Sequence, residues 1–286
     1  MVFGRGPQPK MGENVHVVSL TAQWMAAARA LESRRGDGRL FVDRFAHDLA
    51  LPHGYELLER YKGGGVCDFI AIRTRYFDDA VTAAAETEGI RQIVLVAAGM
   101  DTRAYRLRWP SGTSIFEIDH AELLAEKARR LAALDAASSA TRVDVPADLS
   151  VAWRHRLLNA GFDPAKRTAW IVEGLVFYLS PDQVGTLLQE LRALSAIGSW
   201  LLTDMPSRTL LESPLGRPFL SALAADGVPW IFGSDEPMDF LKSTGWTSTE
   251  VRQPGEEGAG AGRWPYPVPP AGVKGIPRTW LLKATT

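Results

Sequence analysis

The sequence predicts an α/β fold: a Rossmann-like, seven-stranded and mostly parallel sheet with helices on both faces, an N-terminal helical extension and a lid after the fifth strand. Three observations support this fold class. Helical patterns occupy most of residues 19–88, five apolar runs then alternate with helical stretches, and two strand-like runs lie near the end of the sequence. Alternating strands and helices favour a parallel sheet covered on both faces. Two late strands suit a final antiparallel pair.

The N-terminal region carries the helical patterns. Residues 19–34 are rich in alanine, and Ser19 is expected to be the N-cap of their helix. Residues 43–62 have the pattern of two short helices, the second ended by the glycines of 63–65. Residues 66–88 have the pattern of one long helix.

The strands are expected after residue 90. Apolar, largely β-branched runs are typical of buried parallel strands. Residues 263–272 contain four prolines and cannot form a central strand, so we expect a loop there. The expected strands are 91–97, 113–119, 140–145, 167–173, 198–204, 246–251 and 277–284, with helices at 120–136, 150–160 and 181–196.

The segment 205–237 differs from the regular part of the chain. It contains five prolines together with Phe219, Trp230 and Phe232. Prolines among aromatic residues, directly after a strand, predict a lid over the carboxyl-terminal edge of the sheet.

Composition limits the classes of function. The chain has 286 residues, a formal net charge of −1 and 46% hydrophobic residues, so nothing favours binding to nucleic acid or an anionic membrane. Cys67 is the only cysteine, and the five histidines lack metal-ligand spacing, so no metal is expected. No signal peptide or membrane-length apolar run is recognised, which predicts a soluble, cytoplasmic protein. The oligomeric state is left open.

A nucleoside site is indicated by a small-residue turn and an acid. Ala97, Ala98 and Gly99 follow the first strand, and Asp119 ends the second strand 20 residues after Gly99. Small side chains let a ligand approach the backbone, and a carboxylate at the next strand tip can bind ribose hydroxyls. An ordinary turn with a solvated Asp119 is the alternative.

Arg73 is the second candidate. It lies on the apolar stripe of the helix 66–88, between Ile70 and Phe77, whereas Arg75 lies off that stripe. A guanidinium on a buried face needs an anion. That anion is either a core carboxylate or the carboxylate of a bound ligand, unless the side chain reaches the surface.

Acids at three successive strand ends are the third feature. Asp148 and Leu149 follow the third strand, and Glu173 closes the fourth, so both acids should face the crevice that Asp119 faces. Helix capping is an alternative for Asp148. The turn has Ala97 and Thr102 where a dinucleotide fingerprint has glycines, which favours S-adenosylmethionine, a ligand without phosphate, over a nicotinamide cofactor.

Several segments together resemble the leucine carboxyl methyltransferase-like family of S-adenosylmethionine-dependent methyltransferases, which includes bacterial enzymes of natural-product pathways. The family loop usually begins with glycine where this chain has Ala97. The segments are RTRYFDDAV (73–81), AAGMDTRAYRL (97–107), FEIDHAELLAEK (116–127), PADL (146–149), VEGLVFYLS (172–180), and, for the bacterial members, SLTAQWMAAARALES (19–33) and LFVDRFA (40–46).

The resemblance implies a role for each candidate. Arg73 is similar to the arginine that holds the methionine carboxylate, 97–99 to the loop under the methionine chain, and Asp119 to the ribose acid. Asp148 and Leu149 resemble the adenine contacts, and Glu173 the acid at the methionine end.

Three further residues receive expectations of their own. Tyr178 could line the acceptor pocket, although a core tyrosine is the more common case. Asp101 and Thr102 are expected to cap the helix that follows the turn.

The predicted function is O-methylation of a carboxylate or phenolic oxygen on a small secondary-metabolite-like acceptor, because no marked catalytic base accompanies the cofactor residues. Methylation of a peptide C-terminus and a non-catalytic nucleoside-binding regulator are the alternatives. The predicted division is a helical segment covering the cofactor (1–88), a cofactor-binding core (89–204), an acceptor-binding lid (205–245) and a closing strand pair (246–286).

Overall fold

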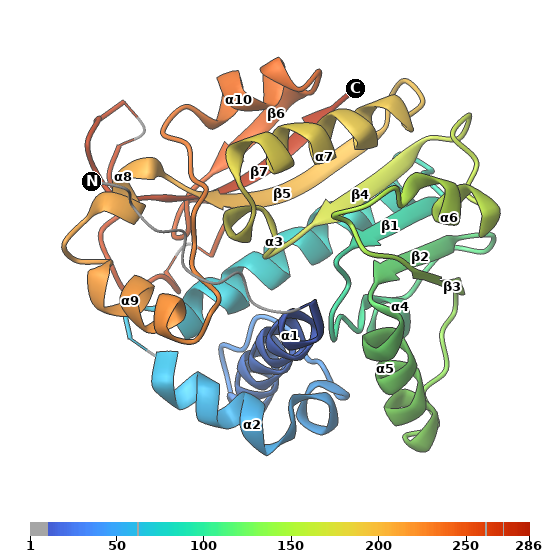
Figure 1. The fold of residues 1–286 in the computed structure, drawn as a ribbon, viewed down its shortest axis with the longest axis horizontal. Coiled ribbons are helices and arrows are strands. Elements are labelled where there is room, and N and C mark those ends of the chain that lie inside the picture. The colour runs from blue at the N-terminus through green and yellow to red at the C-terminus, as the bar shows by residue number, and fades with distance from the viewer. Residues whose placement is uncertain (1–10, 62, 261, 271) are drawn as a thin grey trace.

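The computed structural model describes residues 11–61, 63–260, 262–270 and 272–286, and only the backbone of 11–20. Its centre is one seven-stranded sheet in the order β3-β2-β1-β4-β5-β7-β6 (Figure 1). The predicted fold class is confirmed. The strands are β1 (Gln92–Val96), β2 (Ser114–Asp119), β3 (Thr141–Pro146), β4 (Thr168–Val172), β5 (Trp200–Pro206), β6 (Thr247–Arg252) and β7 (Thr279–Thr285).

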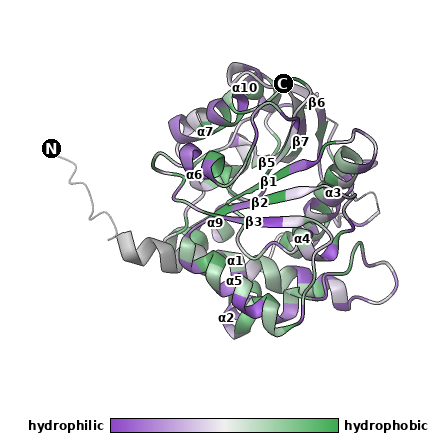
Figure 2. Cartoon of the chain, turned by 90° about the vertical axis from the view of Figure 1, so that its right-hand side faces the viewer, coloured by the Kyte–Doolittle hydropathy of each residue, from purple (hydrophilic) through white to green (hydrophobic). Residues whose placement is uncertain are grey.

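The first five strands are parallel, and the last two are not. β7 lies antiparallel between β5 and β6, which gives the predicted closing pair. Every residue of β1, β4 and β5 is buried, as expected for central strands with both faces covered. The edge strand β3 carries hydrophilic residues and is largely accessible (Figure 2).

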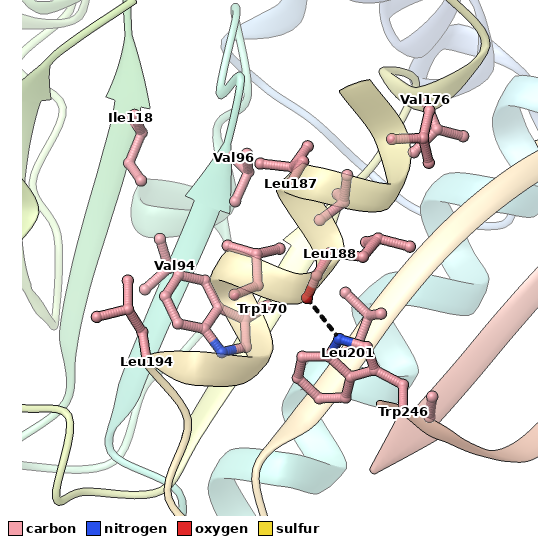
Figure 3. Close-up of a cluster of buried hydrophobic side chains, with 14 of the residues drawn as sticks. Val94, Val96, Ile118, Trp170, Val176, Leu187, Leu188, Leu194, Leu201 and Trp246 are labelled. Atoms are coloured by element: carbon pink, nitrogen blue, oxygen red, sulfur yellow. Dashed lines mark hydrogen bonds between the residues drawn. The ribbon is translucent and has the colours of Figure 1, made fainter. Parts of the chain in front are cut away.

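Helices cover both faces of the sheet. α6 (Arg154–Asn159), α7 (Pro181–Ala193) and α10 (Pro237–Ser243) contribute to a core on one face, where Trp170 packs against Leu187 and Leu188 (Figure 3). α3 (Val66–Glu86) and the short α4 (Arg103–Arg106) contribute to the core on the other face. α5 (Ala121–Ala133) follows β2.

Two helices form the N-terminal extension. α1 spans Met11–Arg34, so Ser19 lies inside the helix and the predicted N-cap at Ser19 is wrong, because the helical backbone continues toward the N-terminus. The first ten residues of the predicted segment 1–88 lie outside the described residues. α2 (Ala46–Tyr61) is broken at Leu51, where φ is 55° and Pro52 follows. It is therefore two short helices, as predicted.

The segment after β5 forms two short helices, α8 (Arg208–Glu212) and α9 (Arg217–Ala225). Pro218 stands in the first turn of α9, where a missing N–H costs nothing. α9 lies beside α2 (Figure 1), and Phe219 and Leu223 belong to the same core cluster as Leu58 and Tyr61. This contact joins segments more than 150 residues apart in the sequence.

Candidate functional site

The carboxyl ends of β1, β2, β4 and β5 bring a turn and three acids to one edge of the sheet. Asp119 of β2 is only 5% exposed. Its Oδ2 accepts a hydrogen bond from the Gly99 backbone N–H at 2.7 Å, and its Oδ1 accepts from the His120 N–H at 2.7 Å. The alternative of a solvated Asp119 is therefore wrong. The carboxylate is fixed in position and retains lone pairs that can accept further hydrogen bonds.

The turn after β1 has an unusual backbone. Ala97 has φ 54° and Gly99 has φ 50°, both in the left-handed region. That region costs alanine about 1–2 kcal/mol and glycine almost nothing. A Cβ at Gly99 would lie 3.2 Å from the Ala22 Cβ of α1, so the N-terminal helix packs directly on the turn.

Arg73 of α3 is 3% exposed and reaches the same edge. Its Nε donates to Glu173 Oε1 at 2.9 Å, and its Nη1 donates to Asp204 Oδ2 at 3.0 Å. Its Nη2 lies 3.2 Å from the Met25 sulfur of α1. Arg73 is therefore paired with core carboxylates, which is one of the three outcomes that its stripe position allowed. A guanidinium carries five N–H groups, so donors remain for a ligand.

Asp204 was not among the predicted site residues. It is fully buried in β5, and its Oδ1 accepts from the Gly174 N–H at 2.7 Å. Gly174 has φ 70°, and a Cβ there would lie 3.2 Å from Arg73 Nη1, so this position requires glycine. Burial raises the pKa of Asp204 in spite of the Arg73 charge. The rule that selected Asp119 and Glu173, an acid at a strand end, applies equally to Asp204.

Arg103 of α4 is a second buried arginine that sequence reasoning missed. Its Nε donates to Asp78 at 2.7 Å, and its Nη1 pairs with Asp101 at 2.5 Å and lies 2.7 Å from Glu173 Oε2. Burial alone would raise the pKa of Glu173, but Arg103 and Arg73 outweigh burial and lower it. We call Arg73, Asp101, Arg103, Glu173 and Asp204 the charged cluster.

Glu173 keeps one oxygen available. Its buried Oε2 has the ion-pair contact with Arg103 but no hydrogen bond to any group in the described residues. Such an acceptor can take a hydrogen bond from a cationic ligand group.

The predicted adenine contacts lie after β3. Asp148 and Leu149 are partly buried, and Asp148 Oδ1 accepts from both the backbone N–H and the hydroxyl of Ser150, at 2.8 and 2.6 Å. These hydrogen bonds lower the pKa of Asp148. Helix α6 begins only at Arg154, so Asp148 is not its N-cap and this alternative is wrong.

The expected caps of α4 are half correct. Asp101 Oδ1 accepts from the Arg103 N–H at 2.6 Å, as a cap does. The Thr102 hydroxyl instead donates to Asp43 Oδ2 at 2.7 Å, and Arg29 of α1 pairs with the same oxygen at 3.0 Å. Thr102 therefore helps to fix the turn to the N-terminal region.

Tyr178, the acceptor-pocket candidate, lies in η1 (Val176–Tyr178) after β4. Its ring centroid is 4.8 Å from that of Phe177, which lies 4.2 Å from that of Trp230. Burial raises the pKa of Tyr178 to about 12, while Trp230 and Arg73 lower it. The phenol is therefore a neutral hydrogen-bonding group near Arg73.

Comparison with known proteins places the chain in a family. A relative from Frankia alni named "Putative S-adenosyl-L-methionine-dependent methyltransferase" is 40% identical over 263 residues, 88% of this chain and 91% of the relative. A relative of the same description from Mycolicibacterium smegmatis is 38% identical over 252 residues, 81% of this chain and 84% of the relative. The family described as leucine carboxyl methyltransferase matches residues 22–192.

The chain belongs to the leucine carboxyl methyltransferase family. The predicted family is confirmed, and the predicted cofactor agrees with the names of these relatives. The fold is also that of a solved "putative methyltransferase" from Thermobifida fusca. The two share 16% identity with a TM-score of 0.63, over 98% of this chain and 100% of that chain.

Two surface hollows of this family member lie away from the strand carboxyl ends. One, of about 280 Å³, is lined by residues of α1 and α3 and by Arg263. The other, of about 360 Å³, is lined by residues at the amino ends of β1 and β2, including Gln92 and Ser114. Ligands of open α/β sheets bind at the carboxyl ends, so neither hollow is the candidate site.

The described part of the chain lacks both a metal-binding group and a membrane-spanning helix. No group of three or more histidine, cysteine or acidic residues could hold a metal ion there. None of the described helices combines the length and apolar character needed to cross a membrane.

Proposed function

We propose that the chain is an S-adenosylmethionine-dependent O-methyltransferase that acts on a carboxylate or phenolic oxygen of a small, secondary-metabolite-like acceptor. The observation that carries the proposal is the meeting of Arg73, Glu173 and the turn 97–99 at one edge of the sheet. A zwitterionic methionine end needs a cation and an acid side by side, and Arg73 Nε lies 2.9 Å from Glu173 Oε1. Family membership supports the same class.

The residues present fit this cofactor. Arg73 would hold the α-carboxylate through its remaining N–H groups, and Glu173 Oε2 would accept from the α-ammonium. The turn 97–99 would lie under the methionine chain, and Asp119 would bind the ribose hydroxyls. Asp148 and Leu149 would contact adenine.

When bound, S-adenosylmethionine supplies an electrophilic methyl group on its sulfonium, and the acceptor oxygen forms the new C–O bond as the C–S bond breaks. The work of the protein is to align that oxygen and exclude water. α1 packs on the turn through Ala22 and on Arg73 through Met25, and so would cover the cofactor.

The acids near Tyr178 support an acceptor that arrives ionised. Asp204 and Glu173 are paired with arginines. Asp226, at the end of α9, pairs with Arg60 and accepts a hydrogen bond from the Tyr61 hydroxyl. A carboxylate or an acidic phenol needs no proton removed by the enzyme, whereas a neutral alcohol does.

The experiment is calorimetric binding of adenosylhomocysteine to the wild type and to Arg73→Ala and Arg73→Lys. We expect both variants to bind at least roughly tenfold more weakly, because a point-charged lysine does not replace the planar guanidinium. Arg75→Ala is the matched control and should bind normally, because Arg75 is on the same helix but exposed and bonded only to Asp79 and the Leu40 carbonyl among the described residues. Unchanged affinity in both Arg73 variants would contradict the assignment.

Turnover separates an enzyme from a non-catalytic binder. Wild type is incubated with methyl-labelled S-adenosylmethionine and a panel of carboxylic acids and phenols, and with a peptide bearing a free C-terminus. Label on a small acid or phenol is the expected result. Label on the peptide alone would favour the peptide-directed activity, and tight cofactor binding without transfer would favour a regulatory binder.

A further inference from the structure

Seven of the nine indole N–H groups of the chain fall into two sets. Trp24 has a buried Nε1 atom without a hydrogen-bond partner among the described residues. The buried Nε1 of Trp230 makes no hydrogen bond of normal geometry there, although its N–H lies close enough to the Tyr178 hydroxyl to lower the pKa of that phenol. In contrast, five other indoles donate hydrogen bonds of 2.8 to 3.0 Å, and Figure 3 shows that of Trp246. The five pairs are Trp109 with Arg103 O, Trp153 with Glu190, Trp170 with Ser195, Trp246 with Leu188 O and Trp280 with Ser234 O.

An unpaired buried donor destabilises a fold, because the N–H has lost its hydrogen bond to water and gained none in return. The other five indoles show that this chain satisfies buried indole N–H groups elsewhere. Two exceptions in one region therefore indicate that an atom from outside the chain supplies the missing acceptor.

Both exceptions belong to one aromatic cluster, which we define as Trp24, Tyr61, Phe177, Tyr178, Phe219 and Trp230. Trp24 packs on Tyr61, with ring centroids 4.9 Å apart, and Tyr61 packs on Phe219 at 6.1 Å. Phe219 continues to Trp230 at 5.2 Å. The aromatic cluster thus joins α1 and α2 to the lid helix α9 and to η1.

The aromatic cluster adjoins the charged cluster. Burial raises the pKa of Tyr178, whereas the nearby N–H of Trp230 and the charge of Arg73 lower it, so both groups lie close to the Tyr178 hydroxyl. On the other side, Met25, the neighbour of Trp24 in α1, contacts Arg73 Nη2. The unpaired indoles therefore lie beside the proposed methionine end, where a methyl acceptor has to bind.

We propose that Trp24 and Trp230 bind the methyl acceptor, and that this acceptor is a flat aromatic molecule whose polar atoms accept hydrogen bonds from the two indole N–H groups. The inference rests on the proposed function and adds to it the substrate class and two specificity-determining residues. Aromatic rings select a flat apolar body by edge and face contacts. The indole of Trp230, next to Tyr178, aligns the reacting oxygen.

The test uses protein saturated with adenosylhomocysteine, titrated in a calorimeter with 2-naphthoate and with its saturated analogue decahydro-2-naphthoate. Wild type should bind 2-naphthoate at least roughly tenfold more tightly than the analogue. Trp230→Phe and Trp24→Phe keep a ring but lose the N–H, and each should weaken 2-naphthoate by roughly tenfold. Both variants remove buried or half-buried ring volume, so their thermal midpoints should fall, but by less than that of a variant that also loses an indole hydrogen bond of normal geometry.

Trp280→Phe is the matched control, because its N–H donates to Ser234 O at 3.0 Å. It should keep the affinity for 2-naphthoate and lower the thermal midpoint. Three results would overturn the inference: no binding of 2-naphthoate, equal binding of the saturated analogue, or unchanged affinity in both variants. Failure of adenosylhomocysteine itself to bind would instead refute the proposed function, so the two failures are distinguishable.

Discussion

The charged cluster and the aromatic cluster adjoin, but they are built in opposite ways. In the charged cluster, Arg73 and Arg103 each contact two or more carboxylates, and all of these groups are buried or nearly so. The aromatic cluster leaves the N–H groups of Trp24 and Trp230 without a hydrogen bond of normal geometry among the described residues. Its lid helix α9 has a single fully buried residue, Leu223.

The difference follows from the cost of burying each kind of group. A buried charge without a partner is far more costly than a buried neutral N–H, so the charges of such a site have to be paired with one another before any ligand arrives. A buried neutral N–H can remain unpaired until a ligand supplies its acceptor. We infer that the fold preorganises the cofactor side of the proposed site. The acceptor side depends on its ligand to supply hydrogen-bond acceptors.

The substitution Arg103→Gln tests most directly whether the fold pairs the charges of the charged cluster. The substitution leaves Asp78, Asp101 and Glu173 buried with less positive charge, and we expect the free energy of unfolding to fall by roughly 3–5 kcal/mol. Urea unfolding at pH 7 measures it. Arg75→Gln, at an exposed i,i+4 pair, is the control and should leave the unfolding midpoint in place.

A much smaller decrease in the unfolding free energy of Arg103→Gln would contradict the view that the fold pairs all the charges of the charged cluster. In that case water or a rearranged side chain would be compensating the carboxylates. The clusters would then differ in chemistry but not in how far the fold prepares them.

Much of this architecture could be predicted from the sequence, because it depends on local patterns. The alternation of strands and helices predicted the sheet, and the positions of acids at strand ends identified Asp119 and Glu173. The stripe position of Arg73 made it a candidate for a buried, paired arginine, with a ligand carboxylate or the surface as the other possibilities. Its partner Asp204 obeys the same strand-end rule and could have been named.

Other features depend on contacts between distant segments and leave no local signal. Arg103 lies in a four-residue helix, too short to have an apolar stripe. The unpaired N–H groups of Trp24 and Trp230 become visible only when α1, α9 and η1 are placed together, since the same residue type is bonded at five other positions. The lid helix α9 was predicted only as part of a proline-rich segment.

Acid pH offers a second test of the charged cluster. Burial by itself would raise the pKa of Asp101, but Arg103, Arg29 and Arg106 outweigh burial and lower it from 3.8 to about 2. A lowered pKa means that ionised Asp101 stabilises the fold above pH 3.8, and that this contribution is lost as the pH falls toward 2. At pH 7 it amounts to roughly 2 kcal/mol.

Asp101→Asn should therefore unfold at lower urea than wild type at pH 7, and the difference should shrink to roughly half at pH 3. Trp230→Phe, which carries no titrating group, should show no such pH-dependent difference from wild type. A pH-independent deficit in Asp101→Asn would mean that the lost interaction is a hydrogen bond rather than the charge.

The smallest effect is expected at Ala97, in the turn after β1 and at the family's glycine position. Its φ of 54° strains alanine, but glycine would gain conformational freedom in the unfolded chain, so in Ala97→Gly the two terms largely cancel. We expect a change of about 0.5 kcal/mol or less in unfolding free energy, and equal or tighter binding of adenosylhomocysteine by calorimetry. Ala98→Gly is the matched control: Ala98 is not left-handed, so glycine relieves no strain there and should destabilise the fold. Equal losses in both variants would show that the turn gains nothing from glycine at position 97, and that alanine there is no handicap for the cofactor loop.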